Sequence, residues 1–252
     1  MATLVRDLIY ESIRLLIADE MTDIKIKKRY LDHTSKVHFV PPQYRVLGRI
    51  LQALNIRFGN FIEKLIDSIG KNDPKVSMHA QSGKRCPLRF TAETDSSIDT
   101  YITNRQLPQS RDICDEQFES LLSKIVNVEN ARNSEAQTIT KDIDVLFSTS
   151  DGKFIFVEIK YNDDHDTGKF VDINRKFIKT YAGLVNLLGI TSRQDLELVL
   201  YYFNPTKRYG PIYVPSKNIM RGPQLFDAYF ETKYSEVDGC LREIGNDPDI
   251  LS

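Results

Sequence analysis

Apolar residues recur at helical spacing along most of the first seventy positions, with charged residues between them. One such run lies in residues 2–16, and a longer one extends from Tyr44 to Gly70. This pattern is typical of amphipathic helices. Pro41 and Pro42 separate the two runs, at a place where proline is tolerated because a helix begins there. The first seventy residues are therefore predicted to be helical, with one break.

Two runs of strand-forming residues flank a turn signal farther along the chain. Residues 139–147 alternate and contain β-branched side chains, and residues 154–160 form a second run of the same kind. Between them stands Asp151-Gly152, a dipeptide that supplies the positive φ of a tight hairpin turn. The pattern predicts a β-hairpin.

Helices and a buried strand are predicted around this hairpin. Residues 114–128 and 169–188 each carry an apolar stripe at helical spacing. Residues 196–203 are almost continuously apolar, which is typical of a strand buried on both faces. Strand, helix and strand in this order predict an α/β fold, in which a helical crossover joins the strands of a mixed β-sheet flanked by helices. Residues 224–245 are expected to form a closing helix.

Composition limits the class of protein. The chain has 252 residues, of which 41% are hydrophobic, enough for a substantial core. It contains no run of eighteen apolar residues, so we expect no membrane span, and its N-terminus lacks the features of a signal peptide. The cysteines Cys86, Cys114 and Cys240 are far apart and odd in number. They favour a reducing cytoplasm over a disulfide framework or a zinc site.

Three charged residues interrupt the apolar pattern of the predicted hairpin. Asp144 falls in the first strand, and Glu158 and Lys160 fall in the second. Residues two apart in a strand project from the same face, so Glu158 and Lys160 lie together. Folding at Asp151-Gly152 brings Asp144 close to them. Two carboxylates and one ammonium are thus expected at one end of the hairpin.

This combination suits hydrolysis of a phosphodiester. Two carboxylates can hold Mg²⁺, which keeps several waters and completes its coordination with phosphate oxygens. A bound metal ion lowers the pKa of water and stabilises charge on the phosphate. An adjacent lysine can orient the water and offset negative charge. Asp144 and Glu158 are therefore the predicted metal ligands, with Lys160 as the third catalytic residue.

Asp144 is followed fourteen positions later by Glu158-Ile159-Lys160. This arrangement resembles the motif of the PD-(D/E)xK nuclease superfamily, and in particular that of its Type II restriction endonucleases. Ile143 stands where the motif's name has proline. The resemblance implies a restriction-endonuclease-like core and Mg²⁺-dependent hydrolysis of double-stranded DNA that leaves 5′-phosphate ends. It also implies a homodimer acting at a short palindrome, with or without an interruption, such as GANTC. The resemblance further implies that the protein works in a bacterial or archaeal cytoplasm beside a companion DNA methyltransferase.

Members of this superfamily also use a further carboxylate, for which the sequence offers three candidates. Asp142 lies two residues before Asp144 and is either a supporting ligand or a solvated residue. Glu119 in the predicted helix 114–128 and Glu135 before the hairpin are the other two. Most glutamates of helices are only solvated, so each of these remains an alternative.

Basic residues that could contact DNA cluster in two regions. In the predicted helix 169–188 they are Lys169, Arg175 and Lys176, which suit contacts to phosphates. Residues 205–223 contain no acid and are rich in proline and glycine, which predicts a loop. Arginine, lysine and asparagine can read base edges in the major groove. The candidates for DNA recognition in this loop are Lys207, Arg208, Lys217, Asn218 and Arg221.

The expected division of the chain is a mainly helical region, residues 1–110, and a nuclease core, residues 111–252, that ends in the DNA-recognition loop. The two parts can also form one continuous domain. The helical region is expected to pack on the core or to dimerise. The alternative is that Lys27, Lys28 and Arg29 contact the DNA backbone. Residues 71–110 are polar and broken by prolines, and only residues 97–102 indicate a short strand.

Two other functions remain open from the sequence. A structure-selective repair nuclease or resolvase would use the same Asp144, Glu158 and Lys160, but it would cut without sequence preference. A non-catalytic DNA-binding protein with a nuclease-like fold would not need all three residues. The net charge of −1 counts mildly against any nucleic-acid partner, unless the basic residues are concentrated in one place.

Overall fold

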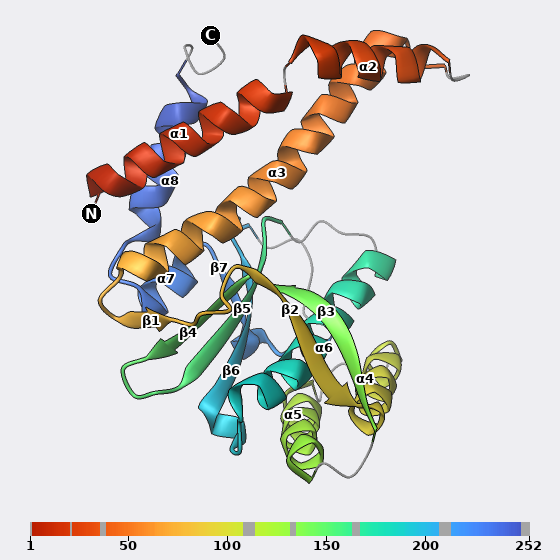
Figure 1. The fold of residues 1–252 in the computed structure, drawn as a ribbon, viewed down its shortest axis with the longest axis vertical. Coiled ribbons are helices and arrows are strands. Elements are labelled where there is room, and N and C mark those ends of the chain that lie inside the picture. Colours follow the sequence, from red (N-terminus) through yellow and green to blue (C-terminus); the bar gives the residue numbers. More distant parts are fainter. Residues whose placement is uncertain are drawn as a thin grey trace. The chain divides into compact units, whose positions relative to one another are not determined.

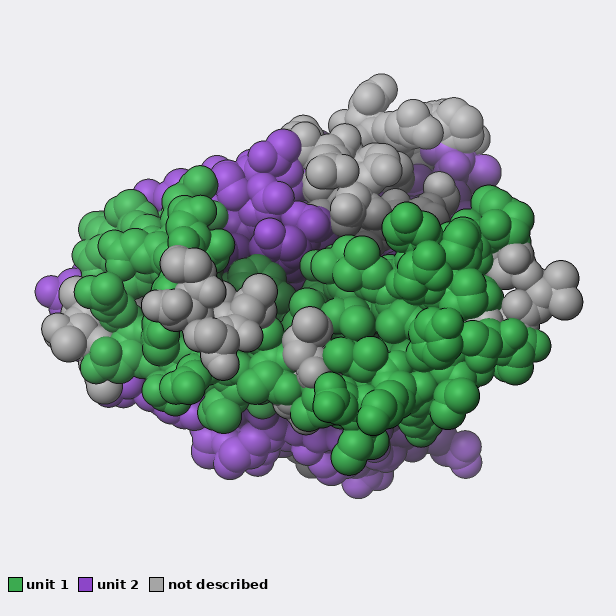
Figure 2. Space-filling view, turned by 90° about the horizontal axis from the view of Figure 1, so that it is seen from above, with its two compact units in different colours: residues 1–65, 232–252 green, residues 66–231 purple. Residues whose placement is uncertain are grey.

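The computed structural model describes residues 2–20, 22–35, 39–107, 114–131, 135–162, 167–206 and 213–247. The chain forms two compact units, which Figure 2 distinguishes by colour. The first contains Met1–Leu65 and Thr232–Ser252, and the second contains Ile66–Glu231. No helix in the described ranges is long and apolar enough to cross a membrane.

The first unit is helical, as predicted. Its elements are α1 (Ala2–Glu20), α2 (Asp23–Thr34), most of α3 (Pro42–Asn72) and α8 (Tyr234–Gly245). The break expected at the two prolines is confirmed, because α3 begins at Pro42. The first and last helices pack together: Arg6 pairs with Glu243 at 3.3 Å, and the Tyr10 hydroxyl donates to Asp247 at 3.4 Å.

The second unit is built on a mixed five-stranded sheet with the strand order β1-β4-β5-β6-β7 (Figure 1). β1 (Val76–Met78), β4 (Val145–Thr149) and β5 (Phe154–Lys160) are antiparallel neighbours. β6 (Leu196–Tyr202) and β7 (Ile219–Arg221) continue the sheet in parallel with β5. The predicted α/β fold with a mixed sheet flanked by helices is confirmed.

The strand predicted over residues 139–147 is in fact two strands. β3 (Ala136–Ile143) pairs with β2 (Lys84–Thr91) in a separate two-stranded sheet, whereas β4 belongs to the main sheet. Asp144 lies between β3 and β4 and belongs to neither. The prediction of one continuous strand was wrong because its first half pairs with β2, whereas its second half belongs to the main sheet.

Helices cover the main sheet on both faces. α5 (Cys114–Ala131) and α6 (Thr167–Leu188) contribute to one apolar core with β2 and the sheet, in which Phe177 stacks on Phe156. On the other face, α7 (Pro223–Tyr229) brings Phe226 against Tyr201. The element order α5-β3-β4-β5-α6-β6 is consistent with the restriction-endonuclease-like core that the resemblance implied.

Two local predictions need correction. Residues 97–102 lie in the helix α4 (Ala92–Arg105), which Thr91 caps by accepting from the Thr94 N–H. Ile98, Tyr101 and Ile102 are buried at the three- and four-residue spacing of a helix, so their apolar character belongs to a helix face rather than a strand. Residues 224–245 form two helices, α7 and α8, instead of one.

The two compact units are bounded near residues 65 and 232. β1 and β2 pair with β4 and β3, so residues from both sides of position 110 build the same sheets. Short 3₁₀ turns, η2 (Arg193–Asp195) and η3 (Ser216–Asn218), precede β6 and β7.

Candidate active site

The turn between β4 and β5 sets the register of the site. Gly152 has φ +85°, and its N–H donates to the Thr149 carbonyl at 2.9 Å, so the hairpin turn predicted at Asp151-Gly152 is confirmed. In this register Val145 faces Val157. The next residues outward are Asp144, which directly precedes β4, and Glu158 of β5. The turn chemistry therefore brings the two carboxylates together.

Asp144 is held in place by the backbone of the neighbouring strand. Its side chain is 8% exposed, and Oδ2 accepts a hydrogen bond from the Ile159 N–H at 2.8 Å. A buried carboxylate is costly unless such partners satisfy it. The hydrogen bond fixes the carboxylate beside Glu158 and Lys160.

Lys160 lies among three oxygen atoms. Its Nζ is 2.8 Å from Glu158 Oε1, 2.7 Å from the Ile159 carbonyl oxygen and 3.7 Å from Asp144 Oδ2. The side chains of Lys160 and Glu158 are 23% and 15% exposed, so the ion pair is largely sheltered from water. The predicted set of Asp144, Glu158 and Lys160 is brought together by the fold.

The same oxygens form a suitable environment for a divalent cation. The Lys160 ammonium is a cation that already lies among two carboxylates and a backbone carbonyl, all of them hard oxygen donors of the kind that Mg²⁺ prefers. The described residues contain no group of three or more acidic, histidine or cysteine side chains placed to hold a metal ion. Any bound cation would therefore need water or phosphate oxygens as well.

Asp142 and Lys141 lie beside the site on β3. Asp142 is exposed and pairs in register with Arg85 of β2, whereas Asp144 is buried and Glu158 is half-buried. Lys141 was not among the predicted residues. Partial burial and the nearby Lys176 charge lower its pKa, against the opposing effect of Glu158. Its place in an alternating strand beside Asp142 was the signal that could have identified it.

The other two candidate acids lie elsewhere. Glu119 on α5 pairs with Arg193 at 3.2 Å and with Lys217 at 2.9 Å. Burial raises the pKa of Glu119, but these two partners outweigh it and hold the pKa below its usual value. Glu135 precedes β3, whereas Asp144 follows it, and eight extended residues span roughly 27 Å. Neither glutamate joins Asp144 and Glu158.

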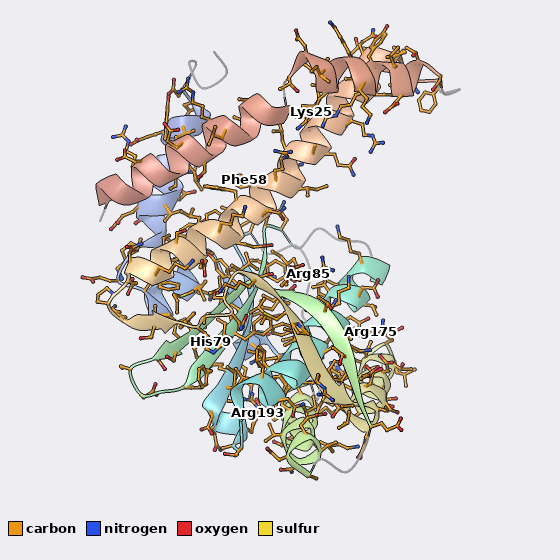
Figure 3. The ribbon with its side chains drawn as sticks, viewed as in Figure 1. Lys25, Phe58, His79, Arg85, Arg175 and Arg193 are labelled. Carbon is orange, nitrogen blue, oxygen red and sulfur yellow. The ribbon has the colours of Figure 1, made fainter. Side chains whose placement is uncertain are left out.

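The basic residues of α6 differ in their surroundings. Arg175, labelled in Figure 3, pairs with Asp99 at 2.9 Å and with Asp172 at 3.3 Å. Lys169 and Lys176 are exposed, and Lys176 is close enough to Lys141 to affect its pKa. Lys176 therefore lies close to Lys141 of β3.

The predicted DNA-recognition loop is only partly described. Lys207 and Arg208 lie outside the described residues. Lys217 pairs with Glu119, and Asn218 is buried, with its amide donating to the Leu198 carbonyl at 3.0 Å. Asn218 therefore serves the packing of η3 on β6 and does not present its amide on the surface.

Arg221 occupies the same edge of the sheet as Lys160. The strand register pairs Lys160 with Tyr202 and Tyr202 with Arg221, so the three residues form one row across β5, β6 and β7. Neighbouring strands are about 4.8 Å apart, which puts the Lys160 and Arg221 backbones about 10 Å apart. The Arg221 guanidinium lies 4.5 Å from the centre of the Tyr202 ring.

Comparison with known proteins gives two matches of high coverage. Residues 1–245 match the family model described as Type II restriction endonuclease, HinfI. The chain is also 40% identical over 251 residues to the Type II restriction enzyme HinfI of Haemophilus influenzae, which covers 98% of this chain and 93% of that enzyme. No solved structure matches the chain.

Proposed function

From the premise that this chain belongs to the HinfI family of Type II restriction endonucleases, we propose that Asp144, Glu158 and Lys160 form its catalytic centre. The reaction is Mg²⁺-dependent hydrolysis of double-stranded DNA at a specific site. The observation that carries this proposal is the convergence of the Lys160 ammonium with both carboxylates and the Ile159 carbonyl.

Asp144 and Glu158 would hold the cation, and the Ile159 carbonyl is a third oxygen within reach. A bound Mg²⁺ would supply a water of lowered pKa and offset the charge on the phosphate. The hydrogen bond from the Ile159 N–H engages one oxygen of Asp144 and orients the carboxylate, so the carboxylate need not reorganise to accept a cation.

Lys160 would orient the attacking water and stabilise negative charge at the scissile phosphate. In the reaction the water oxygen bonds to phosphorus, the bond from phosphorus to O3′ breaks, and O3′ takes a proton. The products are a 5′-phosphate and a 3′-hydroxyl. Glu158 would hold the ammonium in place through their 2.8 Å contact.

The substrate would be a short palindrome, with or without an interruption, and GANTC is the first sequence to examine. A palindrome matches a two-fold symmetric protein, so the active form would be a homodimer. Arg221 is a candidate for contact with DNA because it lies in the row of Lys160. A companion methyltransferase would protect host DNA in the bacterial or archaeal cytoplasm.

The family match over residues 1–245 favours a restriction endonuclease over a structure-selective nuclease or a non-catalytic DNA-binding protein. One experiment distinguishes the three functions. Purified chain and its Lys160→Ala variant are incubated with unmethylated phage DNA in Mg²⁺ and in EDTA. We expect discrete fragments from the unaltered chain in Mg²⁺ only. Sequencing the ends identifies the site, and direct religation checks for 5′-phosphates.

A smear of fragments without common ends would instead indicate a structure-selective nuclease. Intact DNA under every condition, on methylated and unmethylated substrates alike, would indicate a DNA-binding protein without catalytic activity. Equal fragments from the unaltered chain and from Lys160→Ala would contradict the assigned catalytic centre while leaving the nuclease activity in place.

A further inference from the structure

The helical unit exposes an unusual share of the large apolar side chains. Among the described residues, eleven large hydrophobic side chains are exposed, and nine of them belong to residues 1–65. Scattered exposed apolar residues need no explanation, but a concentration on one unit indicates an interaction surface.

Three of these residues form a stripe along α3. Tyr44, Leu47 and Leu51 are 62%, 52% and 53% exposed. Their spacings of three and four residues are those of a heptad repeat, and the half-buried Leu54 and Phe58 continue the same spacing. From the first residue to the last, the stripe extends about 21 Å along the helix axis.

The stripe carries no charge. At 100° per residue, its neighbours on the same face are Gly48 and Asn55, whereas Arg45, Arg49 and Arg57 project from other sides of the helix. A face without charge is a poor partner for DNA phosphates or for an acidic protein. It is complementary to another apolar face.

Four basic residues of this unit line a groove on the other side of α3. Arg49 and Ile56 of α3 line a groove of about 430 Å³ together with Lys25, Lys28 and Arg29 of α2. Figure 3 labels Lys25 on α2 and Phe58, at the end of the stripe, on α3. Phosphate contacts, if this unit makes them, belong to the groove, so the stripe is left for a different partner.

We propose that the stripe of α3 from Tyr44 to Phe58, whose exposed members are Tyr44, Leu47 and Leu51, pairs with the same stripe of a second copy of this chain. This inference rests on the proposed function, since it names the surface that makes the enzyme two-fold symmetric. A two-fold interface uses the same patch on both copies, and an uncharged heptad stripe satisfies that requirement. Gly48 lies on this face, and a Cβ added there would have no described atom within 4 Å, so a second helix can approach closely.

Leu51 is the midpoint of the stripe. Two-fold pairing centred on the stripe therefore brings the two copies of Leu51 face to face, whether the helices run parallel or antiparallel. This geometry allows a test in which the substituted residue meets its own copy. The matched control is Ile56, which is 62% exposed on the same helix but lines the groove on the other side.

The experiment measures the mass of the full chain by sedimentation equilibrium, with and without its DNA site. The unaltered chain and Ile56→Glu are expected at twice 29.0 kDa. Leu51→Glu should raise the dissociation constant of the dimer about 30-fold or more. An equimolar mixture of Leu51→Glu and Leu51→Lys should restore the dimer, because opposite charges then face each other. Circular dichroism checks that each variant is folded.

A second readout uses oxidation. Leu51→Cys should form a disulfide-linked dimer, whereas Ile56→Cys and the unaltered chain should not. A single-chain mass for the unaltered protein in all conditions, or a Leu51→Glu dimer as tight as the unaltered one, would overturn the proposal. Absence of Mg²⁺-dependent cleavage by the unaltered chain would refute the proposed function but would not change the measured masses. Failure of the proposed function and failure of the proposed interface are therefore distinguishable.

Discussion

The carboxylate of Asp144 accepts a hydrogen bond from the backbone N–H of Ile159 at 2.8 Å, and both groups are buried. This bond ties the interruption between β3 and β4 to the strand that carries Glu158 and Lys160. The position of the Asp144 carboxylate, the proposed metal ligand, is therefore fixed by a hydrogen bond to the backbone of β5.

Substitutions of Asp144 should separate this structural role from the catalytic one. Both Asp144→Asn and Asp144→Ala are expected to abolish cleavage, because each removes the negative charge. Asparagine keeps an acceptor for the Ile159 N–H, whereas alanine leaves a buried donor unsatisfied, at a cost of about 1–3 kcal/mol. Urea denaturation should show this difference in unfolding free energy. Equal stability of the two variants would mean that the hydrogen bond does not orient the carboxylate.

Arg221 should contribute to DNA affinity. We expect Arg221→Ala to weaken binding to the cleavage site about 10- to 100-fold, in the range of one arginine contact to a base edge. Arg221→Lys should restore only part of the loss, because lysine cannot place a planar guanidinium over Tyr202. Fluorescence anisotropy in a Lys160→Ala background measures binding without cleavage. Arg242→Ala, which breaks an exposed pair with Asp238, is the control and should leave affinity unchanged.

The stability contributed by Glu119 should depend on pH. Burial alone would raise the pKa of Glu119, but Lys217 and Arg193 lower it from its ordinary value of 4.5. A lowered carboxyl pKa stabilises the folded state above the ordinary value and loses this effect as the pH falls through the folded value. The melting temperature of the unaltered chain should therefore exceed that of Glu119→Gln at neutral pH, and the gap should shrink below about pH 4.5. In a Lys217→Met background this difference in melting temperature should be smaller. A difference that does not change with pH would contradict the ion pairs as the source of the lowered Glu119 pKa.

Gly183 allows α6 to pack closely on β2. A Cβ at Gly183 would overlap the Leu88 side chain. Although alanine is the better helix former by about 1 kcal/mol, we expect Gly183→Ala to lower the free energy of unfolding by about 1–3 kcal/mol through overpacking. Gly239→Ala in α8, where a Cβ would meet no described atom within 4 Å, should raise stability instead. Chemical denaturation compares the two, and a stabilising Gly183→Ala would show that the interface relaxes freely.

The hairpin that carries the proposed catalytic residues could be predicted from the sequence because its signals are local. The turn at Asp151-Gly152 and the spacing of Glu158 and Lys160 on β5 lie within a few residues of one another. The pairing of β2 with β3 could not be predicted in the same way. β2 contains Pro87 and several basic residues, which reduce its strand signal, and its partner lies about fifty residues away.

Functional predictions for single polar residues depended on contacts that a sequence does not contain. Asn218 resembled a base-reading residue until its burial against β6 was known. Glu119 resembled a candidate ligand, but its partner Arg193 comes from a turn more than seventy positions later. Lys141 of β3 lies near Glu158 of β5, although the two residues belong to strands of different sheets.

The most direct test of the catalytic centre is single-turnover cleavage of a duplex that contains the identified site. The comparison is between Lys160→Ala and Lys153→Ala, a lysine of the same hairpin that pairs with Glu197. We predict that Lys160→Ala cleaves at least about 100-fold more slowly, with DNA affinity and fold retained, and that Lys153→Ala cleaves at the unaltered rate. Equal rates for Lys160→Ala and the unaltered chain would contradict the account.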